Sequence, residues 1–103
     1  MLRLAAILLL TIGSFAQQLT VGTAMAAPGQ RATGFIEVPA GSDAATRIPV
    51  VLIRGSNPGP TLAIVCGAHG TEYTSIIAVE KLAQVLQPAS ISGNVILVPL
   101  VNM

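Results

Sequence analysis

The chain has 103 residues, of which 52% are hydrophobic and 9% are charged. Its formal net charge of +1 provides no basic patch, so we expect no nucleic-acid partner. Its single cysteine, Cys66, excludes an intrachain disulfide.

The apolar excess is concentrated in residues 1–26, which carry one charge, Arg3. Residues 4–10 are apolar throughout, and the segment ends on Ala24-Met25-Ala26, with small residues at the two positions that a signal peptidase reads. This pattern predicts a signal peptide over residues 1–26 and an exported protein, periplasmic or secreted, with no stable membrane association after its removal. The alternative is an uncleaved membrane anchor, but Gln17 and Gln18 interrupt the apolar run before the roughly 20 residues that a spanning helix needs.

Residues 27–47 are predicted to form a leader, unstructured to residue 34, with a candidate edge strand at residues 33–38. Residues 48–54 are rich in β-branched side chains and predict a second strand. Pro58 and Gly59 suit the central positions of a type II turn before a third strand at residues 61–66. That strand is almost wholly apolar, so we expect it to be buried on both faces at the centre of a sheet.

A helix is predicted over residues 72–87, followed by a fourth strand at residues 95–101. The helix should bury one broad apolar face, made by Ile76, Ile77, Val79, Leu82, Ala83, Val85 and Leu86. Strand, helix and strand form one βαβ crossover, so the fold class is α/β. One helix does not cover both faces of such a sheet, and we therefore interpret the chain as a truncated domain.

The candidate chemistry lies between the third strand and the helix, at His69-Gly70-Thr71-Glu72. Ligands of open α/β sheets bind at the carboxyl ends of the strands, and imidazole and carboxylate groups are common zinc ligands. The alternative is structural: Thr71 caps the helix, Glu72 interacts with the helix dipole, and His69 is satisfied by a carbonyl group. Cys66 ends an apolar strand and is expected to pack as a small buried residue.

Three motifs together resemble the succinylglutamate desuccinylase/aspartoacylase family, which belongs with the zinc carboxypeptidases. They are the Pro58-Gly59-Pro60 segment, the Gly67-x-His69-Gly70-x-Glu72 corner, and the Val98-Pro99-x-x-Asn102 strand end. The resemblance covers roughly residues 48–102, and it departs at Ser75, where many members carry a glycine.

The resemblance implies a partial three-layer α/β/α sandwich with a mixed sheet, and it makes residues 48–103 the N-terminal part of a zinc hydrolase domain. His69 and Glu72 match the first two Zn²⁺ ligands of the family. The third ligand, the general base and the substrate-binding residues would lie beyond the chain end, because His69 is the only histidine.

The expected reaction is cleavage of an amide or ester bond in a small acylated amino acid or peptide-like substrate, and the 103 residues alone are expected to be inactive. The alternative from another class is a non-catalytic exported binding or interaction module, a degenerate relative of the enzymes.

Overall fold

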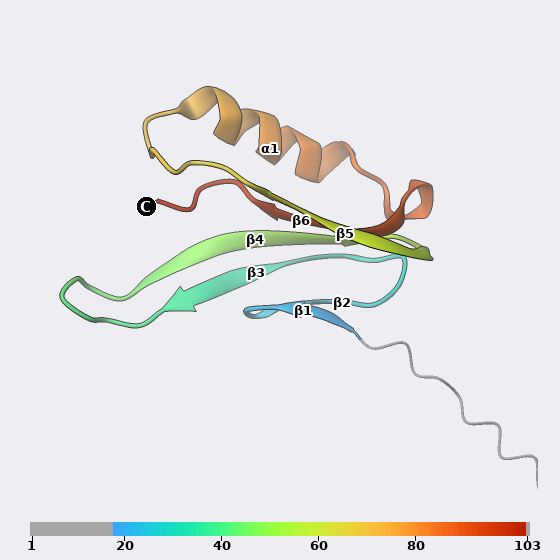
Figure 1. Cartoon of the computed structure of the whole chain (residues 1–103), viewed down its shortest axis with the longest axis horizontal. Coiled ribbons are helices and arrows are strands. Elements are labelled where there is room, and N and C mark those ends of the chain that lie inside the picture. The colour runs from blue at the N-terminus through green and yellow to red at the C-terminus, as the bar shows by residue number, and fades with distance from the viewer. Residues whose placement is uncertain (1–17, 103) are drawn as a thin grey trace, which may run out of the picture.

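The computed structural model describes residues 18–102, which form a mixed sheet between a helix and a β-hairpin (Figure 1). The sheet has four strands in the order β3-β4-β6-β5. The elements are β1 (Leu19–Val21), β2 (Ala24–Ala26), β3 (Arg31–Val38), β4 (Thr46–Arg54), β5 (Asn57–Val65), α1 (Tyr73–Val85), the 3₁₀ helix η1 (Pro88–Ser90) and β6 (Ser92–Val98).

The predicted βαβ crossover is confirmed, since β5 and β6 are adjacent and parallel and α1 connects them. β4 pairs antiparallel with both β3 and β6, which makes the sheet mixed. The candidate edge strand is also confirmed, because β3 is the outer strand beside β4. The α/β class with a mixed sheet is therefore as expected.

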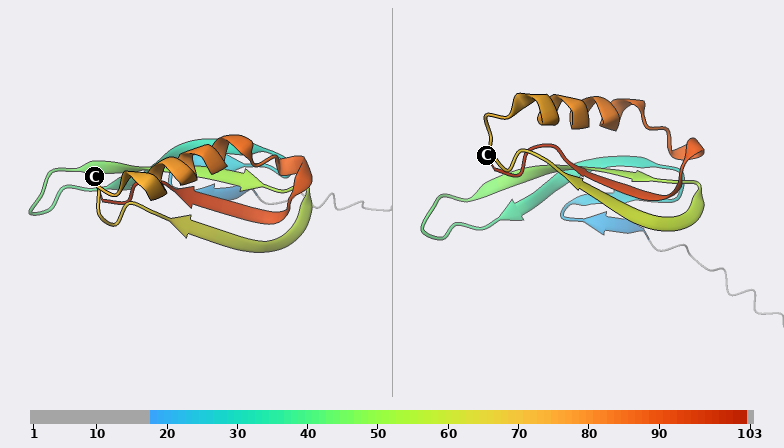
Figure 2. Two further views of the ribbon diagram at one scale, coloured as in Figure 1. Left: turned by 90° about the horizontal axis from the view of Figure 1, so that it is seen from above. Right: turned by 45° about the horizontal axis from the view of Figure 1, so that its top comes forward.

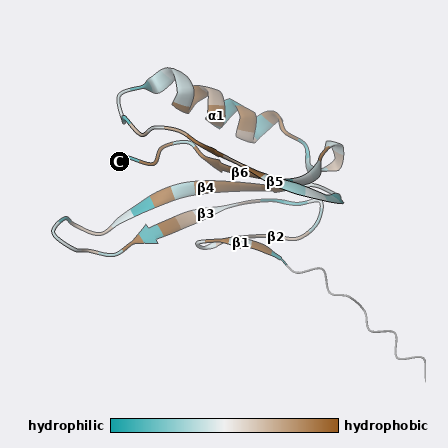
Figure 3. Cartoon of the chain, viewed as in Figure 1, coloured by the Kyte–Doolittle hydropathy of each residue, from teal (hydrophilic) through white to brown (hydrophobic). Residues whose placement is uncertain are grey.

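Two hydrophobic cores lie on opposite faces of the sheet (Figure 2). On one face, Ile53 and Leu97 pack against Val79 of α1, and we call this group the helix-side core. On the other face, the hairpin-side core joins Ala24 and Ala26 of β2 to residues of β4 and β6. The hydrophobic parts of β4 and β6 lie between these covering layers (Figure 3). In the described part of the chain, the third layer is thus a hairpin where an α/β/α sandwich would have helices.

The predicted burial of the third strand is wrong. β5 is the outer strand beside β6, and Leu62 and Val65 are 59% and 57% exposed. Apolar composition alone therefore did not distinguish a central strand from an outer one.

The predicted type II turn at Pro58-Gly59 is also wrong, because both residues belong to β5 and Gly59 has no positive φ. A Cβ at Gly59 would lie 2.7 Å from the backbone nitrogen of Gly93, so the glycine permits close strand approach. Prolines are tolerated in β5 because it is an outer strand.

Residues 27–34, predicted to be unstructured, have regular structure. The predicted leader contains a turn in which the Gln30 N–H donates to the Ala27 carbonyl over 3.1 Å, and β3 begins at Arg31. Residues 1–17 of the predicted signal peptide lie outside the described residues, while the exit at Ala24-Met25-Ala26 coincides with β2. Processing after Ala26 stays a prediction.

α1 begins at Tyr73 and ends at Val85, within the predicted range. Its apolar face is narrower than predicted, because Ile77 and Val85 are exposed while Ile76 and Val79 are buried. Among residues 18–102, no helix is long and apolar enough to cross a membrane.

Candidate metal centre

The loop of residues 66–72 leaves the carboxyl end of β5, beside the segment that leaves the carboxyl end of β6. Parallel strands end at the same edge of a sheet, so the crossover itself brings these segments together. The sequence carries His69 and Glu72 on the first segment and Asn102 on the second.

Hydrogen bonds fasten the two segments along their length. The Cys66 N–H donates to the Val98 carbonyl over 2.8 Å, and the Val101 N–H donates to the Cys66 carbonyl over 3.0 Å. Asn102 then binds the loop twice: its backbone N–H donates to the Gly67 carbonyl, and its side-chain Nδ2 donates to the Ala68 carbonyl, each over 3.0 Å. The backbone immediately before His69 is therefore held in place.

Two glycines permit this approach. Gly67 has a φ of 71°, and a Cβ there would lie 2.8 Å from the Cα of Leu100. A Cβ at Gly70 would lie 2.9 Å from the Asn102 carbonyl oxygen. Larger residues at either position would push the loop away from the segment after β6.

His69 and Glu72 belong to one turn, closed by the Glu72 N–H donating to the His69 carbonyl over 3.0 Å. Both residues are exposed, and neither side chain makes a hydrogen bond or ion pair with the residues that the structure describes. Glu72 occupies the N-cap position of α1 but makes no side-chain capping bond, and Thr71 precedes that position. The capping roles considered from the sequence therefore find no support in the contacts.

The donor set suits a zinc ion, because one imidazole and one carboxylate are accessible on a fixed loop. It is incomplete, since catalytic zinc sites have three protein ligands and residues 18–102 contain no group of three His, Cys, Asp or Glu side chains able to hold a metal. Cys66 is half-buried and packs with the helix-side core, as expected for a structural cysteine.

Sequence reasoning missed how Asn102 acts on the loop. The residue was visible in the strand-end motif, but its hydrogen bonds to Gly67 and Ala68 depend on the parallel pairing of β5 with β6. The available signal was the position of Asn102. It lies a few residues after β6, and the glycine-rich loop of residues 66–72 follows the parallel neighbour β5.

Comparison with known proteins identifies the class. Residues 58–103 match the succinylglutamate desuccinylase/aspartoacylase catalytic domain. A curated relative, N-alpha-acetyl-L-2,4-diaminobutyric acid deacetylase of Halomonas elongata, is 37% identical over 73 residues, which make up 67% of this chain and 21% of that protein.

Solved structures agree with this match. A succinylglutamate desuccinylase/aspartoacylase from Rhodobacter sphaeroides superposes with a TM-score of 0.62 and 35% identity, covering 71% of this chain and 23% of that one. An aspartoacylase family protein from Mesorhizobium loti superposes with a TM-score of 0.65 and 34% identity, covering 74% and 24%. The chain belongs to the succinylglutamate desuccinylase/aspartoacylase family. It spans about a fifth of the curated relative and about a quarter of each of these structures.

Proposed function

We propose that the protein is a zinc-dependent deacylase that hydrolyses an amide or ester bond of a small acylated amino acid or a peptide-like substrate. The observation that carries the proposal is the exposed His69 and Glu72 pair, presented by a fastened loop at the carboxyl edge of the sheet. Family membership supports it, and the relatives are named as a deacetylase, a desuccinylase and an aspartoacylase.

His69 and Glu72 would hold the zinc ion, with a third ligand from outside these 103 residues. Zinc in such a site supplies Lewis-acid polarisation of a carbonyl group and a bound water that ionises near neutral pH. The contribution of this chain is to fix two ligands: Asn102 holds the loop from one side, and α1 begins directly after Glu72. The general base and the substrate-binding groups would also come from a longer protein.

The test is metal analysis and hydrolysis with the full-length protein. We expect His69→Ala to abolish both bound zinc and hydrolysis of acetylated or succinylated amino acids, because a neutral imidazole ligand is lost. Glu72→Ala should weaken zinc binding severely. Glu80→Ala is the matched control, since Glu80 is an exposed carboxylate of α1 that follows Glu72 by two helical turns, and it should leave both properties unchanged.

Cys66→Ala should also leave zinc binding and hydrolysis nearly intact, because Cys66 packs with the helix-side core. Stoichiometric zinc and full turnover in the His69→Ala protein would show that the ligand assignment is wrong. Zinc binding without hydrolysis of any acylated amino acid in the unsubstituted protein would favour the non-catalytic binding module.

We also propose that the protein is exported. Arg3, the largely apolar residues 4–12 and the small residues that follow them support this, since a positive start and a short apolar run are the features of a secretory signal. Recovery of the protein only from the cytoplasm of its native host would contradict export.

A further inference from the structure

The β1–β2 hairpin is part of the sheet's core. Ala24 and Ala26 have no exposed surface, and they pack against Val50, Leu52 and Val98. Leu52 is itself fully buried, and Val50 is 1% exposed. Within the described residues, the hairpin is the layer on this face, so its removal would expose these side chains to water.

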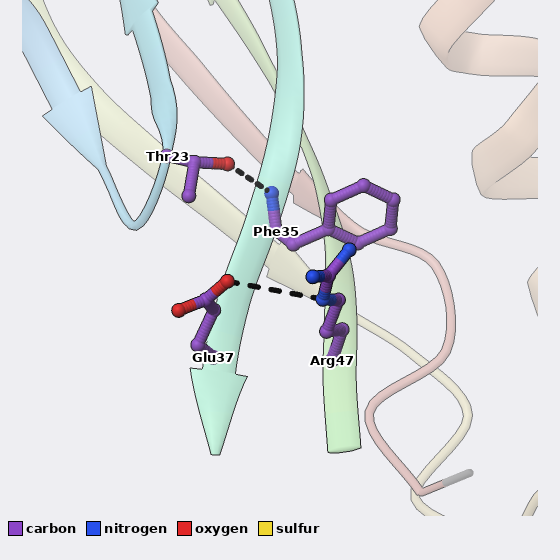
Figure 4. Close-up of polar contacts among 4 residues, drawn as sticks. All are labelled: Thr23, Phe35, Glu37 and Arg47. Carbon is purple, nitrogen blue, oxygen red and sulfur yellow. Dashed lines mark hydrogen bonds and ion pairs between the residues drawn. The ribbon is translucent and has the colours of Figure 1, made fainter. Parts of the chain in front are cut away.

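Hydrogen bonds of backbone and side-chain groups hold the hairpin to β3 and β4. The Thr23 N–H donates to the Phe35 carbonyl over 2.9 Å. In return, the Phe35 N–H donates to Oγ1 of Thr23 over 2.9 Å (Figure 4). At the other end, Nη1 of Arg54 donates to the Ala26 carbonyl over 3.2 Å. Both the loop and the last strand of the hairpin are thus fastened.

A glycine in β3 allows the hairpin backbone to approach the strand closely. Gly34 lies in the middle of β3, and a Cβ there would be 2.5 Å from the backbone nitrogen of Ala24 and 2.7 Å from Oγ1 of Thr23. Glycine weakens a strand interior unless another backbone approaches closely, and here the hairpin is that backbone. Gly22, with a φ of 56°, forms the hairpin loop with Thr23, and a Cβ there would collide with the carbonyl oxygen of Phe35.

Cleavage after Ala26 would therefore remove the β1–β2 hairpin, which packs closely against the sheet. A second exit of the same chemistry lies upstream, at Ser14-Phe15-Ala16, with small residues at both positions that a signal peptidase reads. It follows the largely apolar residues 4–12 closely, whereas Ala26 lies well beyond Gln17 and Gln18. Cleavage there would leave only Gln17 and Gln18 before β1 begins at Leu19.

We propose that the exported protein is processed between Ala16 and Gln17, so that the mature protein retains the β1–β2 hairpin. This inference rests on the proposed export but not on the proposed zinc site. Signal peptidase acts on the chain before it folds, so the burial of Ala26 does not itself prevent cleavage there. The inference instead compares the two possible mature proteins: the one that begins at Gln17 keeps the hairpin layer, and the one that begins at Ala27 lacks it.

The test is the N-terminus of the mature full-length protein, isolated from the periplasm or medium and measured by intact mass and N-terminal peptide mapping. A mature protein that begins at Gln17 supports the proposal. One that begins at Ala27 overturns it but leaves export standing. A protein that retains Met1 in the periplasm or medium overturns the proposed processing, and recovery only from the cytoplasm overturns export as well.

A matched pair of variants tests the site independently of the final fold. Ala16→Leu and Ala26→Leu each place a large side chain at one candidate position before the cut, and pulse labelling reads processing before folding matters. We expect Ala16→Leu to accumulate the precursor and Ala26→Leu to be processed at the normal rate. The reverse pattern overturns the proposal, even if Ala26→Leu later fails to fold.

Discussion

At the residue scale, the geometry of the candidate metal loop depends on Gly67. Its φ of 71° is strained for any residue with a Cβ, by about 1–2 kcal/mol. An added methyl group would also lie 2.8 Å from the Cα of Leu100, a backbone atom that cannot rotate away. The loop and the segment after β6 would have to separate to relieve that contact.

We therefore expect Gly67→Ala to lower the free energy of unfolding of the full-length protein by about 1–3 kcal/mol. It should also weaken zinc binding, because His69 lies two residues along the same loop. Gly41→Ala is the control: Gly41 has no positive φ and no atom within 4 Å of its Cβ position, so a change within about 0.5 kcal/mol is expected. Chemical denaturation and metal titration measure both effects, and equal losses in the two variants would contradict this account.

The sequence was enough to select the candidate ligands, but it did not predict the contacts that hold their loop in place. His69 and Glu72 stand out because an imidazole and a carboxylate follow an apolar strand at its carboxyl end. The fastening by Asn102 and the positive φ of Gly67 arise only when β5 pairs with β6. Such contacts join residues that are far apart in sequence, and local residue patterns do not predict them.

At the element scale, local patterns predicted the segments that carry their own signal. β4 and α1 have a β-branched run and a helical period, and both lie close to the expected residues. The β1–β2 hairpin was missed because its small residues also fit a signal-peptidase exit. The same Ala24-x-Ala26 spacing that suits a protease places two small side chains on one face of a strand.

The fit between β3 and the hairpin gives a prediction for Gly34. In a full-length protein that begins at Gln17, Gly34→Ala should be destabilising by about 1–3 kcal/mol, because the methyl group overpacks against Ala24. In the same protein shortened to begin at Ala27, the steric conflict is absent. The substitution should then be neutral or stabilising by up to about 1 kcal/mol, since alanine restricts the unfolded backbone.

Thermal unfolding of the four proteins forms a double-mutant cycle, and the coupling free energy measures the contact directly. A destabilisation of Gly34→Ala that is the same with and without residues 17–26 would show that the hairpin does not pack on β3. If the protein shortened to begin at Ala27 does not fold, the stability of the sheet depends on the hairpin even more strongly than the coupling free energy would measure.

At the scale of the whole molecule, the described residues leave apolar surface on both sides of an outer strand. Leu62 and Val65 of β5 are more than half exposed. Since side chains alternate along a strand, Leu62 lies on the face of α1 and Val65 on the face of the hairpin. Ile77 and Val85 of α1 are also exposed, at 50% and 67%. In β5, Ile64 packs with the helix-side core, whereas the described residues leave Leu62 and Val65 largely uncovered.

We therefore expect residues 17–103, produced alone, to self-associate, because unpaired strand edges and contiguous apolar patches favour association. Sedimentation velocity should show a mean mass that rises with concentration. The combined substitution Leu62→Lys and Val65→Lys should shift the protein toward the monomer, since it places two like charges on the edge strand. A monomeric profile of the unsubstituted segment at all concentrations would contradict the prediction.

The control must separate the position of the charge from charge in general. Ser42→Lys with Ala44→Lys adds the same two charges to the exposed connection between β3 and β4, away from β5. If net charge alone governed association, this pair would act as well as the pair on β5. We expect it to leave association largely unchanged, because it covers no apolar surface and blocks no strand edge.

In the full-length protein, Leu62→Ala tests whether further chain covers this side chain. The substitution should lower the free energy of unfolding by about 2–5 kcal/mol if Leu62 is buried there, and by well under 1 kcal/mol if it stays exposed.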